Sequence, residues 1–163
     1  MRAPLLVTAL LLAGCSQPLP SSATAEKEVA TVLDDWHDAA AKADEPRYFK
    51  HFAPGGVFLG TDATERWDVD GFRKYAHPHF ERKKAWAFTS TRRAVTVDQA
   101  GAVAWFDEDL ATTNLGPCRG SGVLVREGGR GEWKIAQYNL AVTVPNDRFP
   151  EVKKILEGAV LPR

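Results

Sequence analysis

Asp107 and Arg119 are the residues whose types and positions best suggest chemistry in this sequence. A carboxylate in a dry apolar cavity has a raised pKa and can abstract a proton, while an arginine or an amide stabilises the negative charge that develops. The opposing interpretation is a structural ion pair, which would lower the pKa of Asp107 and weaken it as a base. We favour the structural interpretation and keep Asp107 as the candidate general base.

The strand expected over residues 102–113 must position the carboxylate. Side chains alternate between the two faces of a strand, so Trp105 and Asp107 share one face, which we assign to a pocket. The turn that follows does not fix the register of this strand. A slip of one residue would place Glu108 inside instead.

The last hairpin is expected to supply the polar partners. Arg126 and Glu132 flank a Gly-rich turn and would make a favourable cross-strand pair if they lay opposite one another. The opposite face carries Gly120, Gly122 and Tyr138, and it looks flat enough to pack against another surface. In that register one face ends in four polar residues, which we assign to the pocket: Arg119, Ser121, Gln137 and Asn139.

Aromatic side chains are the other candidate pocket residues. Most such residues in proteins belong to the core, but in a domain open at one end some also touch a ligand. We expect a small, largely apolar molecule with one polar or anionic group near Arg119. The aromatic candidates are Trp36, Trp67, Tyr75, Trp86 and Trp105.

Histidines and cysteines do not indicate a metal site or a cofactor. His77 and His79 offer only two ligands, and a solvated helix end is the better interpretation. We expect His37 on a helix surface or partly packed. Cys118 is expected to be a buried thiol without a partner.

The N-terminus resembles a bacterial lipoprotein signal. Residues 1–14 read as a signal peptide with an apolar run too short to span a bilayer, and Leu12-Ala13-Gly14-Cys15 resembles a lipobox that is acylated at Cys15. Acyl chains would hold the protein on a membrane. Because Ser16 follows the cysteine, we expect the periplasmic side of the outer membrane if the host is Gram-negative.

The rest of the chain predicts one α+β domain. Residues 15–25 read as a flexible tether, with Thr24 available to cap the following helix. Three helices are expected, starting near Glu26, Pro46 and Asp68, before four antiparallel strands. We assign the domain to residues 26–145 and a tail, with a short helix, to residues 146–163. Helices packed on one sheet face make the fold α+β.

Composition excludes one class of function. The chain has 21 basic and 21 acidic residues, and losing Arg2 with the signal leaves a mature charge of about −1. With no basic excess, we expect no nucleic-acid partner.

Six segments together resemble SnoaL-like proteins of the NTF2-like superfamily. The resemblance implies a cone in which a curved antiparallel sheet wraps around about three helices, opens at one end to a pocket, and dimerises through the outer sheet face. The family often carries histidines where Gln137 and Asn139 stand, and these amides weaken the case for catalysis. The segments are 52–54 (FAP), 57–60 (VFLG), 65–67 (ERW), 104–106 (AWF), 119–124 (RGSGVL) and 133–139 (WKIAQYN).

Two functions therefore remain open. The first is a lipid-anchored envelope module that binds a small molecule or a partner protein without catalysis, as a homodimer. The second is an isomerase, cyclase or hydrolase that uses Asp107 or Glu108 as its base. The lack of a strong catalytic motif favours the first.

Overall fold

The computed structural model describes residues 21–158 of the chain. The predicted signal peptide, residues 1–14, and the predicted acylation site Cys15 lie outside the described residues. Within residues 21–158, no helix combines the length and the apolar character that a bilayer-spanning helix needs.

Helix α1 (Ser22–Ala41) is the long first helix that the apolar periodicity predicted, but it starts earlier than expected. The side chain of Ser21 caps it by accepting a hydrogen bond from the backbone N–H of Thr24, so Thr24 lies inside the helix. Residues 22–25, which we had assigned to the tether, form the first turn because Ala25 packs into the core. The buried face of α1 consists of Ala25, Val29, Leu33, Trp36, His37, Ala39 and Ala40.

Helix α2 (Glu45–Phe49) and strand β1 (Phe52–Leu59) follow α1. Asp44 caps α2 by accepting a hydrogen bond from a backbone N–H, and a proline occupies the first turn, where its missing N–H costs nothing. Strand β1 pairs antiparallel with the short strand β2 (Arg66–Asp68).

Helix α3 (Val69–Glu81) confirms the third predicted helix. The carboxylate of Asp68 accepts a hydrogen bond of 2.7 Å from the backbone N–H of Gly71, as expected of an N-cap residue. Phe72 and Phe80 are buried against the rest of the domain.

Four strands complete the sheet: β3 (Thr89–Val97), β4 (Val103–Ala111), β5 (Cys118–Arg126) and β6 (Trp133–Val142). Each pairs antiparallel with the next, which confirms the predicted meander. The six strands lie in the order β2-β1-β6-β5-β4-β3.

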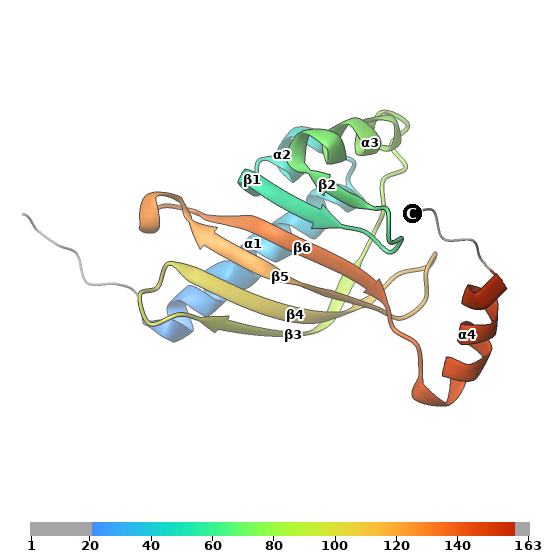
Figure 1. Cartoon of the computed structure of the whole chain (residues 1–163). Coiled ribbons are helices and arrows are strands. Elements are labelled where there is room, and N and C mark those ends of the chain that lie inside the picture. Colours follow the sequence, from blue (N-terminus) through green and yellow to red (C-terminus); the bar gives the residue numbers. More distant parts are fainter. Residues whose placement is uncertain (1–20, 159–163) are drawn as a thin grey trace, which may run out of the picture.

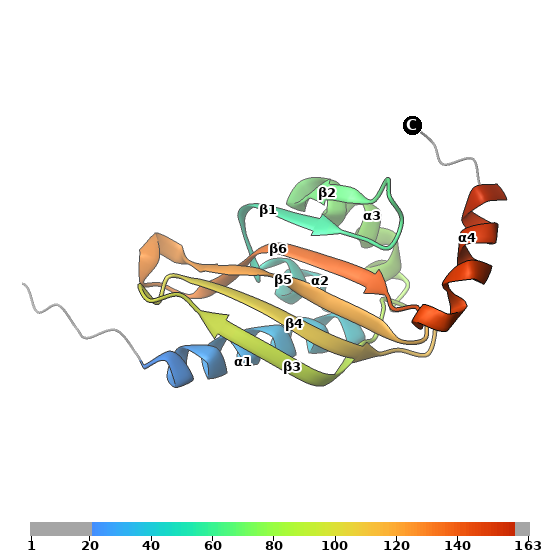
Figure 2. The ribbon, with the colours of Figure 1, turned by 60° about the horizontal axis from the view of Figure 1, so that its bottom comes forward.

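One pairing makes the sheet mixed rather than antiparallel, because β1 runs parallel to β6. This pairing joins strands from opposite ends of the domain sequence, so no local sequence pattern could predict it. Figures 1 and 2 show the curved sheet with α1, α2 and α3 on its inner side. The observed fold is thus the expected α+β cone, corrected by one parallel strand.

The inner face of β4 is the opposite of the one predicted. Ala104, Phe106, Glu108 and Leu110 are buried, whereas Trp105 is 50% exposed and lies on the outer face with Asp107. The prediction was wrong by the one-residue slip that exchanges the two faces of a strand. Both faces of β4 carry an aromatic and a carboxylate, so alternation alone could not choose between them.

The register of the last hairpin also differs from the prediction. Glu132 accepts a backbone hydrogen bond from Glu127, so Arg126 lies opposite Trp133 instead. Strand β6 then carries one extra residue, Ala136, between its pairs with Leu124 and Val123. This β-bulge turns Tyr138 inward and leaves Gln137 and Asn139 on the outer face. Arg119 and Ser121 lie on the same outer face, on β5, so none of these four predicted pocket residues faces inward.

Helix α4 (Phe149–Gly158) confirms the helix expected in the tail. It has no buried residue and lies beyond the end of β6, away from the other helices (Figure 1). It therefore contributes nothing to the core.

Candidate functional site

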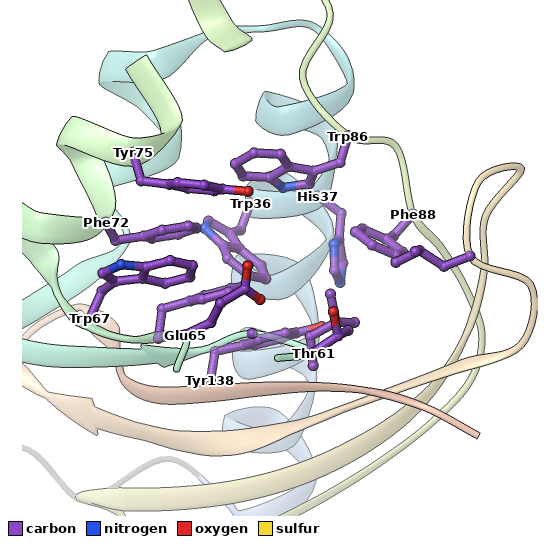
Figure 3. A pocket seen from close by; sticks show the side chains of 14 residues that line it. Trp36, His37, Thr61, Glu65, Trp67, Phe72, Tyr75, Trp86, Phe88 and Tyr138 are labelled. Atoms are coloured by element: carbon purple, nitrogen blue, oxygen red, sulfur yellow. The ribbon is translucent and has the colours of Figure 1, made fainter. Parts of the chain in front are cut away.

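A half-open cavity of about 230 Å³ lies between the helices and the inner face of the sheet, at the end marked by the β1–β2 and β4–β5 turns (Figure 3). Sites for drug-sized molecules usually measure ~300–1,000 Å³, so this cavity suits a smaller molecule. Its lining residues are Trp36, His37, Phe58, Gly60, Thr61, Glu65, Trp67, Phe72, Tyr75, Trp86, Phe88, Leu115, Tyr138 and Leu140.

Stacked aromatic rings build one wall of the cavity. Trp67 from β2 stacks on Tyr75 from α3 with ring centroids 4.7 Å apart, and it also stacks on Phe72 at 5.6 Å. Figure 3 shows these three rings as layers on one side, with Trp86 above them and Phe88 across the cavity. Such offset stacks fix each ring by its neighbours, so the wall is preorganised.

Glu65 is the carboxylate that projects into the cavity (Figure 3). It is half-buried, and one of its oxygens, Oε2, accepts a hydrogen bond of 3.2 Å from the backbone N–H of Asp62. The side chain leans over Gly60, where an added Cβ would come within 2.9 Å of the Cβ and Cδ of Glu65. Gly60 therefore leaves the space that lets the carboxylate reach the cavity.

A buried ionic network underlies His37, on the sheet side of the cavity. Glu108 on β4 is fully buried, and its Oε1 lies 2.7 Å from Nε2 of His37 and accepts a 3.0 Å hydrogen bond from the hydroxyl of Tyr138. Its Oε2 accepts a 2.8 Å hydrogen bond from Nε of Arg93, the residue directly opposite on β3. Arg93 also donates to Asp34 at 2.8 Å.

The network shifts the pKa values of Glu108 and Tyr138 in opposite directions. Burial opposes the charge of Glu108, but the hydrogen bond and charge of His37 and the charge of Arg93 outweigh burial and leave the pKa of Glu108 below its ordinary value. Burial, reinforced by the negative charge of Glu108, raises the pKa of Tyr138 well above its ordinary value. Tyr138 is therefore a hydrogen-bond donor and Glu108 a carboxylate at neutral pH.

Gly120 makes room for this network from β5. It lies directly opposite Glu108, and a Cβ at this position would come within 2.8 Å of Cζ of Tyr138 and 2.9 Å of Oε1 of Glu108. The face that the sequence suggested for dimerisation, with Gly120, Gly122 and Tyr138, is thus the inner face of the sheet. On this face Gly120 makes room for the side chain of Tyr138 rather than for a second subunit.

The structure brings together four of the predicted pocket residues. Trp36, Trp67, Tyr75 and Trp86 all line the cavity. The other five do not, because they lie on the outer face of the sheet: Trp105, Arg119, Ser121, Gln137 and Asn139.

The predicted pair of Asp107 and Arg119 does not form. Asp107 binds Arg92 at 2.8 Å, and Arg119 lies 3.7 Å from Asp109, its partner across the strands. All four side chains are between 41% and 55% exposed, so Asp107 is in no dry cavity and has no basis as a general base. Because Arg119 does not line the cavity, the expectation of a polar or anionic ligand group beside it is wrong as well.

Sequence reasoning missed His37, Glu65 and Arg93. His37 was expected at the surface or partly packed, but it is buried because it lies on the sheet-facing side of α1, one residue from Trp36. Glu108 had been kept as the alternative to Asp107. The one feature of the sequence that could have pointed to Glu65 is Gly60, which precedes the turn before Glu65 and makes room for its side chain.

The remaining histidines and the thiol do not add to the site. His77 binds Glu45 at 2.7 Å near the exposed end of α3. In the part of the chain that the structure describes, no group of three or more His, Cys, Asp or Glu side chains could hold a metal ion. Cys118 is buried, as expected, and burial raises the pKa of its thiol.

A second hollow, of about 500 Å³, is more open and lies across α1 and the β5–β6 turn. Charged side chains in its lining already form ion pairs with each other: Arg126 pairs with Glu28, and Nζ of Lys134 lies 2.9 Å from Oε2 of Glu132. The aromatic cavity is thus the better candidate for ligand binding.

Solved structures with the same fold include several proteins without an assigned role. An NTF2-like protein of unknown function from Pseudomonas putida KT2440 is 14% identical, with a TM-score of 0.63, covering 77% of this chain and 92% of that one. A cystatin-like fold protein from Burkholderia xenovorans LB400 is 17% identical, with a TM-score of 0.60, covering 75% and 95%.

A candidate ketosteroid isomerase from Parabacteroides distasonis ATCC 8503 is 16% identical, with a TM-score of 0.57, covering 72% of this chain and 86% of that one. At these identities the likeness shows the fold alone. The comparison with curated proteins finds no match. A profile of the SnoaL-like domain matches residues 29–145, which run from within α1 to just beyond β6. The chain therefore belongs to the SnoaL-like domain family and has an NTF2-like fold.

Proposed function

We propose that the domain binds a small, largely apolar molecule in the aromatic cavity without transforming it. The observation that carries this proposal is a half-open cavity of about 230 Å³ walled by stacked rings. Glu108, the buried carboxylate nearest to it, does not line the cavity and already accepts hydrogen bonds from Arg93 and Tyr138 while contacting His37. Binding needs only the preformed wall, whereas catalysis by Glu108 needs this network to open.

Native mass spectrometry of residues 21–163, purified from the periplasm of an expressing bacterium, tests the proposal. We expect extra mass from a retained small molecule, or binding of an added apolar probe such as tert-butylbenzene. Thr61→Trp should block the cavity mouth, because Thr61 is exposed and lines the cavity. Thr31→Trp is the matched control, at an exposed position of α1 that does not line this cavity.

Loss of binding in Thr61→Trp, with binding retained in Thr31→Trp, supports the cavity as the site. Equal binding by both variants contradicts the proposal. The proposal is also contradicted if the wild type retains no small molecule and binds no added probe.

A second candidate function is proton transfer by His37, which one observation favours. His37 lines the cavity, and Glu108 fixes its ring through a 2.7 Å contact to Nε2. In acid–base enzymes a buried carboxylate holds the imidazole in this way. The test is incorporation of deuterium from solvent into a small β-diketone. Exchange catalysed by the wild type and lost in His37→Gln favours an enzyme, and no exchange favours the binding module.

We also propose that the chain is exported and held in the cell envelope by acylation of Cys15, on the outer membrane if the host is Gram-negative. Support comes from the lipobox-like residues 12–15 and the short apolar run before them. Labelling cells with a fatty-acid analogue should tag the protein and not Cys15→Ser. Equal labelling of both forms contradicts the anchor.

Homodimerisation through the outer sheet face is a further part of the proposal. This face exposes Val103 and Trp105, and an exposed tryptophan on a sheet is typical of a contact surface. Native mass spectra should show a dimer that Trp105→Glu converts to a monomer. A wild-type monomer at micromolar concentration overturns this part.

A further inference from the structure

We propose that the ligand is a small organic cation, an ammonium ion with apolar substituents, and that Glu65 is its counter-ion. The inference rests on the proposed binding function and names the chemistry of the molecule bound. It is carried by one carboxylate placed among aromatic rings in a cavity whose only basic side chain, His37, is already paired with Glu108.

Glu65 is placed for a ligand rather than for the fold. Within residues 21–158 it forms no ion pair. Its Oε2 accepts one backbone hydrogen bond from Asp62, and the side chain lies over Gly60 because that residue has no Cβ. A carboxylate in this position is partly withdrawn from water and incompletely partnered, which favours a positive group beside it.

The charges around the cavity exclude an anion and favour a cation. The lining contains no lysine and no arginine. Its one basic side chain, His37, is held by Glu108. The nearby Arg93 is matched by two carboxylates, Glu108 and Asp34. The charge of His37 is thus already paired with Glu108, so Glu65 has no counter-ion of its own in the lining, and the lining offers an anionic ligand no unpaired cation.

The aromatic wall fits the rest of such a ligand. Trp36, Trp67 and Trp86 all line the cavity, and tryptophan is the aromatic residue that attracts cations most strongly. An ammonium group with methyl or aryl substituents buries apolar surface against rings while its charge stays near the carboxylate. A neutral molecule of the same shape would gain the first contribution but would leave Glu65 partly desolvated and unpaired.

Three probes of similar size separate the contributions: phenyltrimethylammonium, its neutral isostere tert-butylbenzene, and benzoate. Their affinities for residues 21–163 are measured by titration, followed through tryptophan fluorescence and confirmed by native mass spectrometry. We expect the cation to bind about tenfold more tightly than the isostere, which is a difference of ~1.4 kcal/mol, and benzoate to bind most weakly.

Glu65→Gln keeps the shape of the side chain and removes its charge, so the cation should lose about tenfold in affinity while the isostere is unchanged. Gly60→Ala keeps the charge but pushes the carboxylate aside, and it should reduce the preference for the cation in the same way. Glu127→Gln removes an exposed carboxylate outside the cavity lining and should leave all affinities as in the wild type. Urea midpoints establish that each variant is folded.

Two outcomes overturn the inference. If tert-butylbenzene or benzoate binds the wild type at least as tightly as the cation, and Thr61→Trp abolishes that binding, the cavity binds small molecules but not as a cation site. If no probe binds, both the cation site and the proposed binding function fail. Equal loss of cation affinity in Glu65→Gln and Glu127→Gln would also contradict a specific counter-ion.

Discussion

Replacing Glu108 by glutamine should destabilise the domain by about 3 kcal/mol. The carboxylate is fully buried, and the side chain of Arg93 opposite it is only 10% exposed. Removing one partner of a buried ion pair typically costs ~3–5 kcal/mol, because the other charge is left without compensation. Arg93 retains Asp34 at 2.8 Å, so we expect the lower end of this range.

Urea denaturation of Glu108→Gln provides the assay. A loss of about 3 kcal/mol should lower the midpoint without changing the m-value. In a domain of this size it should lower Tm by roughly 10 °C. Asp107→Asn is the matched control, because its carboxylate is on the same strand, is 44% exposed and pairs with an exposed arginine. That variant should stay within ~0.5 kcal/mol of the wild type.

The reasoning is refuted if Glu108→Gln and Asp107→Asn are equally stable. A second test replaces both members of the buried pair, Arg93→Met with Glu108→Leu. Because apolar side chains can replace a buried pair at little cost, the double variant should lose less stability than the sum of the two single variants.

Three further predictions concern the same domain. The stability advantage of the wild type over Glu108→Gln should shrink in urea titrations at acid pH: the folded-state pKa lies below the ordinary 4.5, so the contribution is present above that value and is lost as pH falls through the folded pKa. Gly120→Ala should cost ~1–3 kcal/mol in urea midpoints, because its methyl group would overlap Tyr138. Asp35→Asn should cost only about 1 kcal/mol, because the side chain of Asp35 is 34% exposed and solvent screens its charge. The hydrogen bond from Arg47 lowers the pKa of Asp35 to about 2. Thermal melts should show the loss of stability at pH 7, and the difference from the wild type should disappear as pH falls from 3.8 towards 2.

The helices and the meander could be predicted because their signals are local. Apolar residues recur at helical spacing in α1, Asp68 stands at a cap position, and Gly-rich segments separate the last strands. The pairing of β1 with β6 could not be predicted, because it depends on two segments far apart in sequence. The result is a parallel pair, β1 with β6, at the edge of an antiparallel meander.

The site was only partly predictable because face assignment needs register. Four residues of the cavity lining, Trp36, Trp67, Tyr75 and Trp86, were predicted by their aromatic type, a criterion that needs no strand register. Strict alternation failed in β6 at Ala136, where the bulge shifts the pattern so that both Ile135 and Tyr138 face inward. No residue type in that strand marks the bulge, so the polar side chains were assigned to the wrong side.

The burial of Cys118 has a practical consequence for following the motions of the domain. In a chain shortened to residues 21–163 this is the only thiol, since the sequence has two cysteines and the other is Cys15. It lies at the start of β5, opposite Leu110 and Val142, is 2% exposed, and has a pKa raised by burial, so a thiol reagent reaches it only when the sheet opens there. The rate of thiol labelling therefore reports how often the sheet opens locally near the β4–β5 turn, which carries Leu115 of the cavity lining. A molecule that binds the closed cavity should lower the labelling rate of Cys118, so binding can be followed without an attached fluorophore.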